Sequence, residues 1–403
     1  MKLYRSSLAL PVLSRGLSLL SMIAFLHTVA MPSTTEAQTE QVLYRFAGQP
    51  DGENPSGSLV MDAKGNVYGT TNAGGEGRWG SVFSISKTGQ EKVLYSFTGG
   101  QDGFGPAVGL LRSKGELYGT AISGGVNSFG TVFRLTPTGK ETTLASFSSS
   151  DGGGYPEGRL IQDKAGNLYG TNSGFNGGYG NGAVFKVSPT GTKSILYTFA
   201  GGTDGMVPYG GLIQDNNGNF YGTTYRGGGA SDRGTIYRLT SDGQEAVLYS
   251  FTGGADGSLP AAELVRDTQG NLYGTTTGGG TEGNGTIFEL TTDGREMVLH
   301  NFNGRDGYYP IANLIRDTQG NLYGTTEFGG RRGLGTVFEL TTNGKLKTLH
   351  HFRGGRDGAN PTGGLVVDAQ GILYGSTSAG GGSPNCSGGC GVVYMITPAA
   401  VGK

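Results

Sequence analysis

The chain has 403 residues, a formal net charge of −1, 80 glycines, 20 tyrosines and 18 phenylalanines. Glycine at this level without a Gly-X-Y period excludes collagen, and so many aromatic residues exclude a disordered chain. A near-neutral charge without a basic run argues against nucleic acid as the main partner, since binding of phosphate needs clustered Lys and Arg.

The N-terminal segment differs from the rest of the chain. Three basic residues, Lys2, Arg5 and Arg15, precede an apolar stretch over residues 17–30, and small residues at Ala30 and Ala37 offer cleavage sites. This pattern predicts a secretory signal peptide over residues 1–37. An uncleaved membrane anchor is the alternative, but the apolar run is shorter than the ~20 residues of a membrane span. We therefore expect a secreted chain, extracellular or periplasmic, without stable membrane insertion after cleavage.

From residue 38 to residue 403 the chain is organised by one repeated unit. An aromatic strand, an Asp-Gly turn and a strand of the Leu-Tyr-Gly-Thr type recur seven times, at spacings of 49 to 53 residues. A period of this size indicates a supersecondary unit that buries its apolar faces by packing on its neighbours. The repeats start near residues 42, 93, 143, 195, 247, 298 and 348.

One repeat contains four predicted strands. In the second copy these are runs of β-forming residues at 93–97, 109–112, 116–121 and 131–135, separated by glycine-rich turns. Four strands repeated seven times predict an all-β fold, a seven-bladed β-propeller of four-stranded blades, with a β-solenoid as the alternative. The last blade lacks an outer strand, and residues 42–46 can complete it and close the ring.

The repeat resembles a known family. The phrases V-L-Y-S-F-x-G-G-x-D-G-x-x-P, G-N-L-Y-G-T-T and G-T-V-F-x-L, over residues 42–398, are similar to the GloVer (Gloeo_Verruco) tandem repeat of secreted bacterial proteins. The resemblance implies an extracellular repeat protein, often with a C-terminal surface anchor, and implies no established activity. We find no such anchor motif in this sequence. A looser similarity is to other seven-bladed propellers, including streptogramin lyases and calcium-dependent lactonases.

The repeated aspartates are candidates for a structural or a metal-binding role. The Asp-Gly aspartates stand singly, without the alternating oxygen ligands of a calcium loop, so we predict turn capping and keep calcium as the alternative. We expect no other cofactor and name no metal ligands. These aspartates are Asp51, Asp102, Asp151, Asp204, Asp256, Asp306 and Asp357. A second set is predicted to cap hairpin turns: Asp62, Asp163, Asp215, Asp267, Asp317 and Asp368.

Histidine and cysteine are rare. His300, His350 and His351 fall on predicted outer strands, far from a central channel, which departs from the streptogramin lyase pattern with its expected catalytic histidine. Cys386 and Cys390, the only cysteines, lie in a glycine-rich loop of the last repeat. In an exported protein this spacing predicts a local disulfide.

The repeats differ most in the loops that share one face of the propeller. These loops carry aromatic and arginine side chains, which binding sites for glycans or peptides use. The alternative is that the aromatic residues pack only against their own loops. The candidate ligand-binding residues are Trp79, Phe129, Tyr179, Tyr225, Arg226, Arg233, Phe328, Arg331 and Arg332.

The innermost strands are expected to line the central channel. Two residues after their fixed leucine, three repeats carry Arg112, Arg266 and Arg316. These arginines can attract an anion or simply extend to solvent.

Together these features predict a secreted, monomeric binding or scaffold module that recognises an extracellular glycan or protein through its variable loop face. No catalytic residue is named. The alternative is a calcium-dependent hydrolase or lyase working in the channel.

Overall fold

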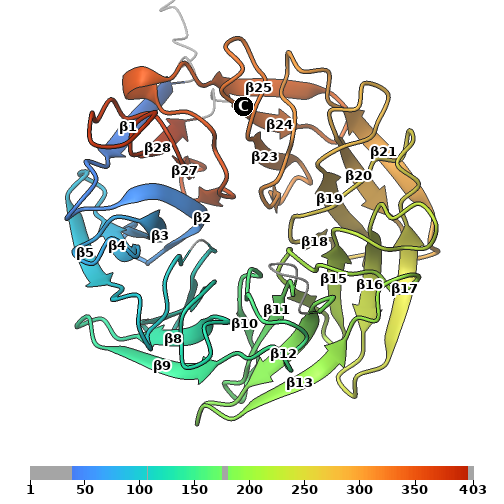
Figure 1. Ribbon diagram of the computed structural model, residues 1–403. Coiled ribbons are helices and arrows are strands. Elements are labelled where there is room, and N and C mark those ends of the chain that lie inside the picture. The colour runs from blue at the N-terminus through green and yellow to red at the C-terminus, as the bar shows by residue number, and fades with distance from the viewer. Residues whose placement is uncertain (1–38, 107, 175–179, 398–403) are drawn as a thin grey trace, which may run out of the picture.

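The computed structural model describes residues 39–106, 108–174 and 180–397, and the predicted signal peptide lies outside these ranges. The described residues form seven four-stranded antiparallel sheets, which stand as blades around a central opening (Figure 1). One short 3-10 helix, η1 (Gly355–Asp357), follows the outer strand of the sixth blade. This confirms the predicted seven-bladed propeller.

Each blade runs from an inner to an outer strand. The first blade contains β2 (Glu53–Met61), β3 (Val67–Ala73), β4 (Ser81–Ile85) and β5 (Glu91–Ser96). The second contains β6 (Leu111–Ser113), β7 (Glu116–Ala121), β8 (Thr131–Leu135) and β9 (Glu141–Ser146). The third contains β10 (Ile161–Gln162), β11 (Leu168–Asn172), β12 (Ala183–Val187) and β13 (Lys193–Thr198).

The remaining blades repeat this order. The fourth contains β14 (Ile213–Gln214), β15 (Phe220–Thr224), β16 (Thr235–Leu239) and β17 (Glu245–Ser250). The fifth contains β18 (Val265–Arg266), β19 (Leu272–Thr276), β20 (Thr286–Leu290) and β21 (Glu296–Asn301). The sixth contains β22 (Ile315–Arg316), β23 (Leu322–Thr326), β24 (Thr336–Leu340) and β25 (Leu346–His351). The seventh contains β26 (Val366–Val367), β27 (Leu373–Thr377), β28 (Val392–Thr397) and β1 (Thr39–Arg45).

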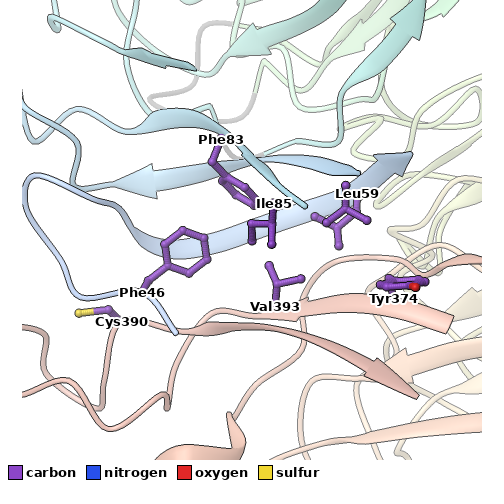
Figure 2. Close-up of a cluster of buried hydrophobic side chains, with 8 residues drawn as sticks. Phe46, Leu59, Phe83, Ile85, Tyr374, Cys390 and Val393 are labelled. Atoms are coloured by element: carbon purple, nitrogen blue, oxygen red, sulfur yellow. The ribbon is translucent and has the colours of Figure 1, made fainter. Parts of the chain in front are cut away.

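The N-terminal strand closes the ring, as predicted. β1 pairs antiparallel with β28, from Thr39 opposite Thr397 to Arg45 opposite Val392. The next residue, Phe46, is 1% exposed and packs in a cluster with Leu59 and Phe83 of the first blade and Val393 of the seventh (Figure 2). The first and last blades therefore share one apolar core, to which the two ends of the described chain both contribute.

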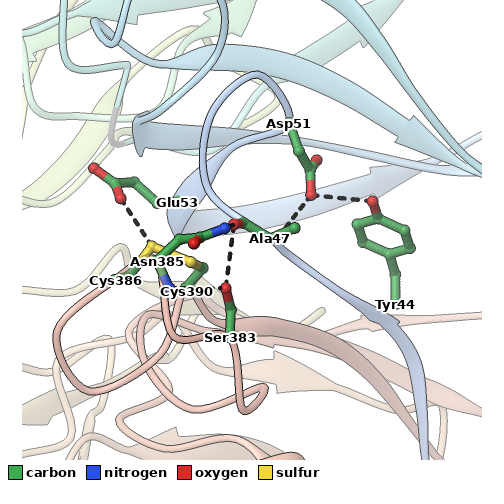
Figure 3. Close-up of a disulfide and its surroundings, with 8 residues drawn as sticks. All are labelled: Tyr44, Ala47, Asp51, Glu53, Ser383, Asn385, Cys386 and Cys390. Atoms are coloured by element: carbon green, nitrogen blue, oxygen red, sulfur yellow. Dashed lines mark hydrogen bonds between the residues drawn. A yellow bond between two sulfur atoms is a disulfide. The ribbon is translucent and has the colours of Figure 1, made fainter.

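The Cys386–Cys390 loop contacts the segment that joins the seventh blade to the first. The two cysteines form a disulfide in the structure, and the same loop places Ser383 and Asn385 against the segment that leaves β1 (Figure 3). Ser383 Oγ and Asn385 Nδ2 donate hydrogen bonds of 3.1 and 2.7 Å to the carbonyl of Ala47. The loop thus holds the connection between the seventh and first blades.

The repeated aspartates cap turns. Asp102 accepts hydrogen bonds from the Thr98 amide and the Tyr95 hydroxyl, each 2.8 Å long. In the second set, Asp215 accepts a bond from the Tyr221 hydroxyl at 3.1 Å. The first set caps its turns in the other blades through Asp51, Asp151, Asp204, Asp256, Asp306 and Asp357. Turn geometry therefore explains why these residues recur.

The glycine and threonine of the Leu-Tyr-Gly-Thr strand make the blades fit together. A Cβ atom on Gly274 would lie 2.6 Å from the Phe288 ring, so only glycine lets this ring lie under the strand. The next residue, Thr275, donates a 2.9 Å hydrogen bond to the carbonyl of Pro310 in the following blade. In four other blades the matching threonine also donates to a carbonyl of the following blade, there two residues before the fixed leucine; these are Thr70, Thr171, Thr223 and Thr325.

Carboxyl groups meet at the outer edges of neighbouring blades. Burial, and then the charge of Asp51, raises the pKa of Glu91 to about 7. Glu245 and Glu296 reach about 7 in the same way beside Asp204 and Asp256, and Glu40 reaches about 7 by burial and then the charge of Asp357. In the third blade Lys193 replaces this glutamate and forms an ion pair with Asp151.

These carboxyl groups predict that the propeller loses stability as the pH rises. The folded-state pKa values lie above the ordinary value of 4.5, so folding takes up protons, and the stabilisation is complete below about pH 4.5 and lost as the pH rises through about 7. We expect about 1 kcal/mol per glutamate, because these side chains are half-exposed and solvent screens them. Thermal unfolding between pH 5 and 8 measures the effect.

The matched control carries Gln at the three positions Glu91, Glu245 and Glu296, which removes the titration and keeps the shape. Its melting temperature should vary less with pH than that of the wild type. A wild-type melting temperature that stays constant or rises between pH 5 and 8 would contradict the prediction.

Candidate functional site

The loops before the innermost strands bring side chains to the mouth of the channel. In each blade a residue with positive φ directly precedes a proline, and in four blades it is bulky: Tyr155, Val207, Leu259 and Tyr309, with φ between 58° and 61°. This backbone conformation costs roughly 1 kcal/mol or more for such residues. A hydrogen bond to the preceding blade helps to hold it, as from the Tyr309 amide to the Asn284 carbonyl at 3.1 Å.

The channel opens on this loop face into a cavity of about 580 Å³, here called the mouth chamber. Its wall combines aromatic rings with charged groups and small residues. The Tyr209 and Tyr225 rings stand 5.2 Å apart at 70°, and Arg226 is exposed beside them. The charged and aromatic side chains in this wall are Glu157, Arg159, Tyr209, Tyr225, Arg226 and Tyr309.

Glu157 is the acidic residue in the described lining of the mouth chamber, and it lacks a complete set of hydrogen-bond partners. Its Oε2 atom is buried and accepts no hydrogen bond from the described residues. Burial raises the pKa of Glu157 to about 7, against a smaller lowering by a hydrogen bond from Ser173. Burial, and then the charge of Glu157, raises the pKa of Tyr209 to about 12. Glu157 therefore brings a carboxyl group with a raised pKa to the wall of the chamber, and one of its oxygens lacks a hydrogen-bond donor among the described residues.

A polar septum crosses the channel below the mouth chamber. Glu263, 6% exposed, accepts hydrogen bonds from Arg159 Nε at 3.0 Å and Nη2 at 2.8 Å, and from Asn313 Nδ2 at 3.2 Å. Asn313 Nδ2 also lies 3.5 Å from Ser58 Oγ. Glu263 holds the pKa of Arg159 above its usual range. These four residues, here called the septum, come from the first, third, fifth and sixth blades.

The far side of the septum is a second cavity of about 700 Å³, the far chamber, which contains the predicted channel arginines. Each guanidinium lies over a tyrosine ring of the preceding blade: Arg112 over Tyr68 at 6.0 Å, Arg266 over Tyr221 at 5.9 Å and Arg316 over Tyr273 at 5.7 Å. These cation–π contacts give the arginines a role between blades. The anion site remains a prediction.

The predicted loop-face residues do not all gather at one site. Tyr225 and Arg226 line the mouth chamber. Three aromatic residues pack on a ring of a neighbouring loop: Trp79 on Phe104 at 5.1 Å, Phe129 on Tyr155 at 5.6 Å and Phe328 on Tyr308 at 5.3 Å. Trp79 remains 45% exposed.

The other predicted loop-face residues lie elsewhere or outside the described ranges. Arg233 is exposed, and a Cβ atom on Gly253 would lie 2.9 Å from its side chain. Arg331 and Arg332 line a separate hollow at the outer edge of the ring. Tyr179 lies outside the described residues.

The septum and the acid of the mouth chamber were not predicted from the sequence, although the repeat contains a signal for the septum. In each blade the septum position immediately precedes the fixed leucine of the innermost strand. It is occupied by Ser58, Gly109, Arg159, Gly211, Glu263, Asn313 and Gly364. In the blades that have glycine at this position, the missing side chain leaves room for the septum. A Cβ atom on Gly211, for example, would lie 3.1 Å from Glu263 Oε2.

The donor set of the channel does not fit calcium. Of the described residues that line the two chambers, Glu157 and Glu263 are the carboxylates, and Glu263 is bonded to Arg159 and Asn313. Calcium takes six to eight oxygen ligands. Within the described ranges, groups of three metal-ligating side chains occur at Glu53, Cys386 and Cys390, and at Glu40, His350 and Asp357, all outside the channel lining.

Comparison with known proteins adds a family and a fold. A model of the Gloeobacter/Verrucomicrobia repeat matches residues 29–178 and 161–393. No curated protein matches the sequence. Within residues 39–106, 108–174 and 180–397, no helix combines the length and apolar character needed to cross a membrane.

Several solved structures are similar in fold. Virginiamycin B lyase from Staphylococcus aureus has a TM-score of 0.58 and 14% identity, over 89% of this chain and 98% of that one. The extracellular domain of a proposed one component system from B. thetaiotaomicron has a TM-score of 0.54 and 12% identity, over 87% of this chain and 39% of that one. A gluconolactonase from Xanthomonas campestris has a TM-score of 0.46 and 15% identity, over 90% of each chain. At these identities the first two similarities support the fold alone, and we conclude nothing from the third.

Proposed function

We propose that this chain, which belongs to the Gloeobacter/Verrucomicrobia repeat family, is a secreted binding module that takes an extracellular glycan in its mouth chamber. The observation that carries the proposal is the carboxyl group of Glu157, with its raised pKa and its unpartnered Oε2 atom, in the wall of a cavity lined by tyrosines. A buried polar atom of this kind costs free energy until a partner satisfies it.

The size and chemistry of the mouth chamber favour a sugar. Its volume of about 580 Å³ falls within the range of small-ligand sites, roughly 300–1,000 Å³. Tyr209 and Tyr225 offer ring faces to the C–H groups of a sugar, while Glu157 and Arg226 offer hydrogen bonds to its hydroxyls. A protein partner would need about 800 Å² of buried surface on each side, which a concave chamber does not present by itself.

A glycan array followed by calorimetry on the best ligand tests the proposal. We expect Tyr225→Ala to weaken binding at least 10-fold, because truncation of a central aromatic side chain usually costs about 2 kcal/mol. Glu157→Gln should remove the change in affinity between pH 6 and 8 that a carboxyl with a pKa of about 7 causes. Val126→Ala, at a 73% exposed loop tip, is the control that should bind normally.

Trp79→Ala shows how far the ligand extends. A loss of affinity would place part of the glycan on the loops of the first blade, whereas normal binding would confine it to the mouth chamber. An empty array for the wild type, or equal affinity of wild type and Tyr225→Ala, would overturn the proposal.

An enzyme acting in the same chamber is the second candidate, and Glu157 favours it. A carboxyl with a pKa of about 7 can act as a general acid or base near neutral pH. Glu157→Gln would then abolish turnover of a bound sugar or lactone and retain its binding. If wild type and Glu157→Gln leave every bound ligand unchanged, the binding function stands alone.

A further inference from the structure

We propose a second binding site, separate from the channel, for the carboxylate groups of an acidic glycan. It is the hollow of about 740 Å³ between the outer strands of the sixth and seventh blades, here called the rim hollow. Arg331 and Arg332 reach it from the loop between β23 and β24. His350 and His351 belong to β25, and Arg353 is the second residue after that strand. Across from them lies β1, which is beside β25 at the edge of the ring (Figure 1).

The three arginines of the rim hollow have free guanidinium groups. All three are exposed, and within the described residues their side chains form no hydrogen bond and no ion pair within 4.0 Å. Guanidinium forks match the geometry of carboxylate and sulfate groups and bind them through paired hydrogen bonds. Three such groups around one hollow fit a ligand that carries several acid groups.

The acidic residues nearby do not cancel this positive charge. Asp357 accepts hydrogen bonds from His350 Nε2 at 3.2 Å and from the Arg353 amide, and it contributes a single negative charge against the three arginines. Burial raises the pKa of Glu40 to about 7, so that this carboxyl is partly protonated at neutral pH. Burial and then Arg331 lower the pKa of His351, which leaves that ring neutral. The hollow therefore keeps a net positive charge.

The first blade shows that the repeat does not need arginine here. At the position of Arg331 it carries Glu76, which lines a hollow together with Asp51, Glu91 and Tyr95. The Glu76 amide donates a 3.2 Å hydrogen bond to Ser96 Oγ, so the loop forms with a side chain of the opposite charge. Because the loop forms with either a negative or a positive side chain at this position, its fold does not require the arginines of the sixth blade. They are therefore available for a ligand.

The lining favours a glycan over an acidic peptide. The apolar residues at the rim hollow, Leu349 and Phe352, are 7% and 0% exposed, so they offer almost no apolar surface. Protein interfaces usually have an apolar or aromatic core. A uronate chain presents carboxylates and hydroxyls along its whole length, which matches arginine, histidine and threonine side chains.

Binding of oligogalacturonate to the full mature chain tests the site. Calorimetry at low salt should show binding by the wild type and at least 10-fold weaker binding by the double variant Arg331→Ala/Arg332→Ala. The matched control, Arg295→Ala/Arg305→Ala, removes the same charge from exposed positions outside the hollow and should bind like the wild type. Unchanged melting temperatures would show that both variants fold.

Other outcomes separate this site from the mouth chamber and from general charge attraction. Tyr225→Ala should leave oligogalacturonate binding intact, because Tyr225 lines the mouth chamber and not the rim hollow. Equal losses in the two arginine double variants would overturn the site, since net charge alone would then explain binding. Binding of a poly-glutamate peptide more tightly than oligogalacturonate would overturn the glycan assignment.

Discussion

A chain that begins at residue 48 should unfold at a much lower temperature than one that begins at residue 38. The shorter chain lacks β1, which leaves the edge of β28 unpaired, and it lacks Phe46, whose ring lies 5.0 Å from that of Phe83. Loss of a buried phenylalanine alone costs about 3–5 kcal/mol. With the strand pairing added, we expect a loss of more than about 5 kcal/mol in the free energy of unfolding, measured by urea denaturation.

Two controls separate ring closure from a general loss of residues. A synthetic peptide of residues 38–47 should raise the stability of the shorter chain with increasing concentration, because it binds the folded state. Phe46→Leu should cost about as much as Phe97→Leu, since Phe97 occupies the matching place against Phe133, at 5.2 Å. Identical melting curves for the two chains would show that β1 does not close the ring.

The fold was predictable because its determinants recur in every repeat. The Tyr95–Asp102 bond and the Thr275–Pro310 bond each have counterparts in several other blades, so the residues that make them stand out as a period. The closing strand was predictable for the same reason, since residues 42–46 repeat a phrase that is missing at the end of the chain. The described β1 begins earlier, at Thr39.

The candidate site was predictable only in part. Tyr225 and Arg226 were found because they interrupt the repeat on the loop face. Arg159 and Glu263 interrupt it as well, but they are 104 residues apart, and only ring closure brings two such positions together. The contact between Arg159 and Glu263 could be predicted only by knowing which positions face the channel axis. Strand twist and loop conformation decide this, and residue types do not reveal it.

Removing the acid of the septum should be the most damaging single substitution in the channel. Glu263→Ala leaves the Arg159 guanidinium without its partner and Asn313 Nδ2 without its strongest acceptor. Breaking a buried ion pair on one side costs about 3–5 kcal/mol, and we expect about 3 kcal/mol because the Arg159 side chain is 31% exposed. Urea denaturation of the single and double variants measures the effect.

The double variant Arg159→Met/Glu263→Leu distinguishes a buried charge from a simple loss of packing. It should recover most of the stability, because no unpaired charge remains. Arg226→Ala is the control for an exposed pair: Arg226 Nη1 lies 3.0 Å from Asp232 Oδ2, the two side chains are 45% and 44% exposed, and the loss of this pair should cost less than about 1 kcal/mol. A double variant as unstable as Glu263→Ala would mean that the shape of the septum, rather than its charge, holds the inner strands around the channel.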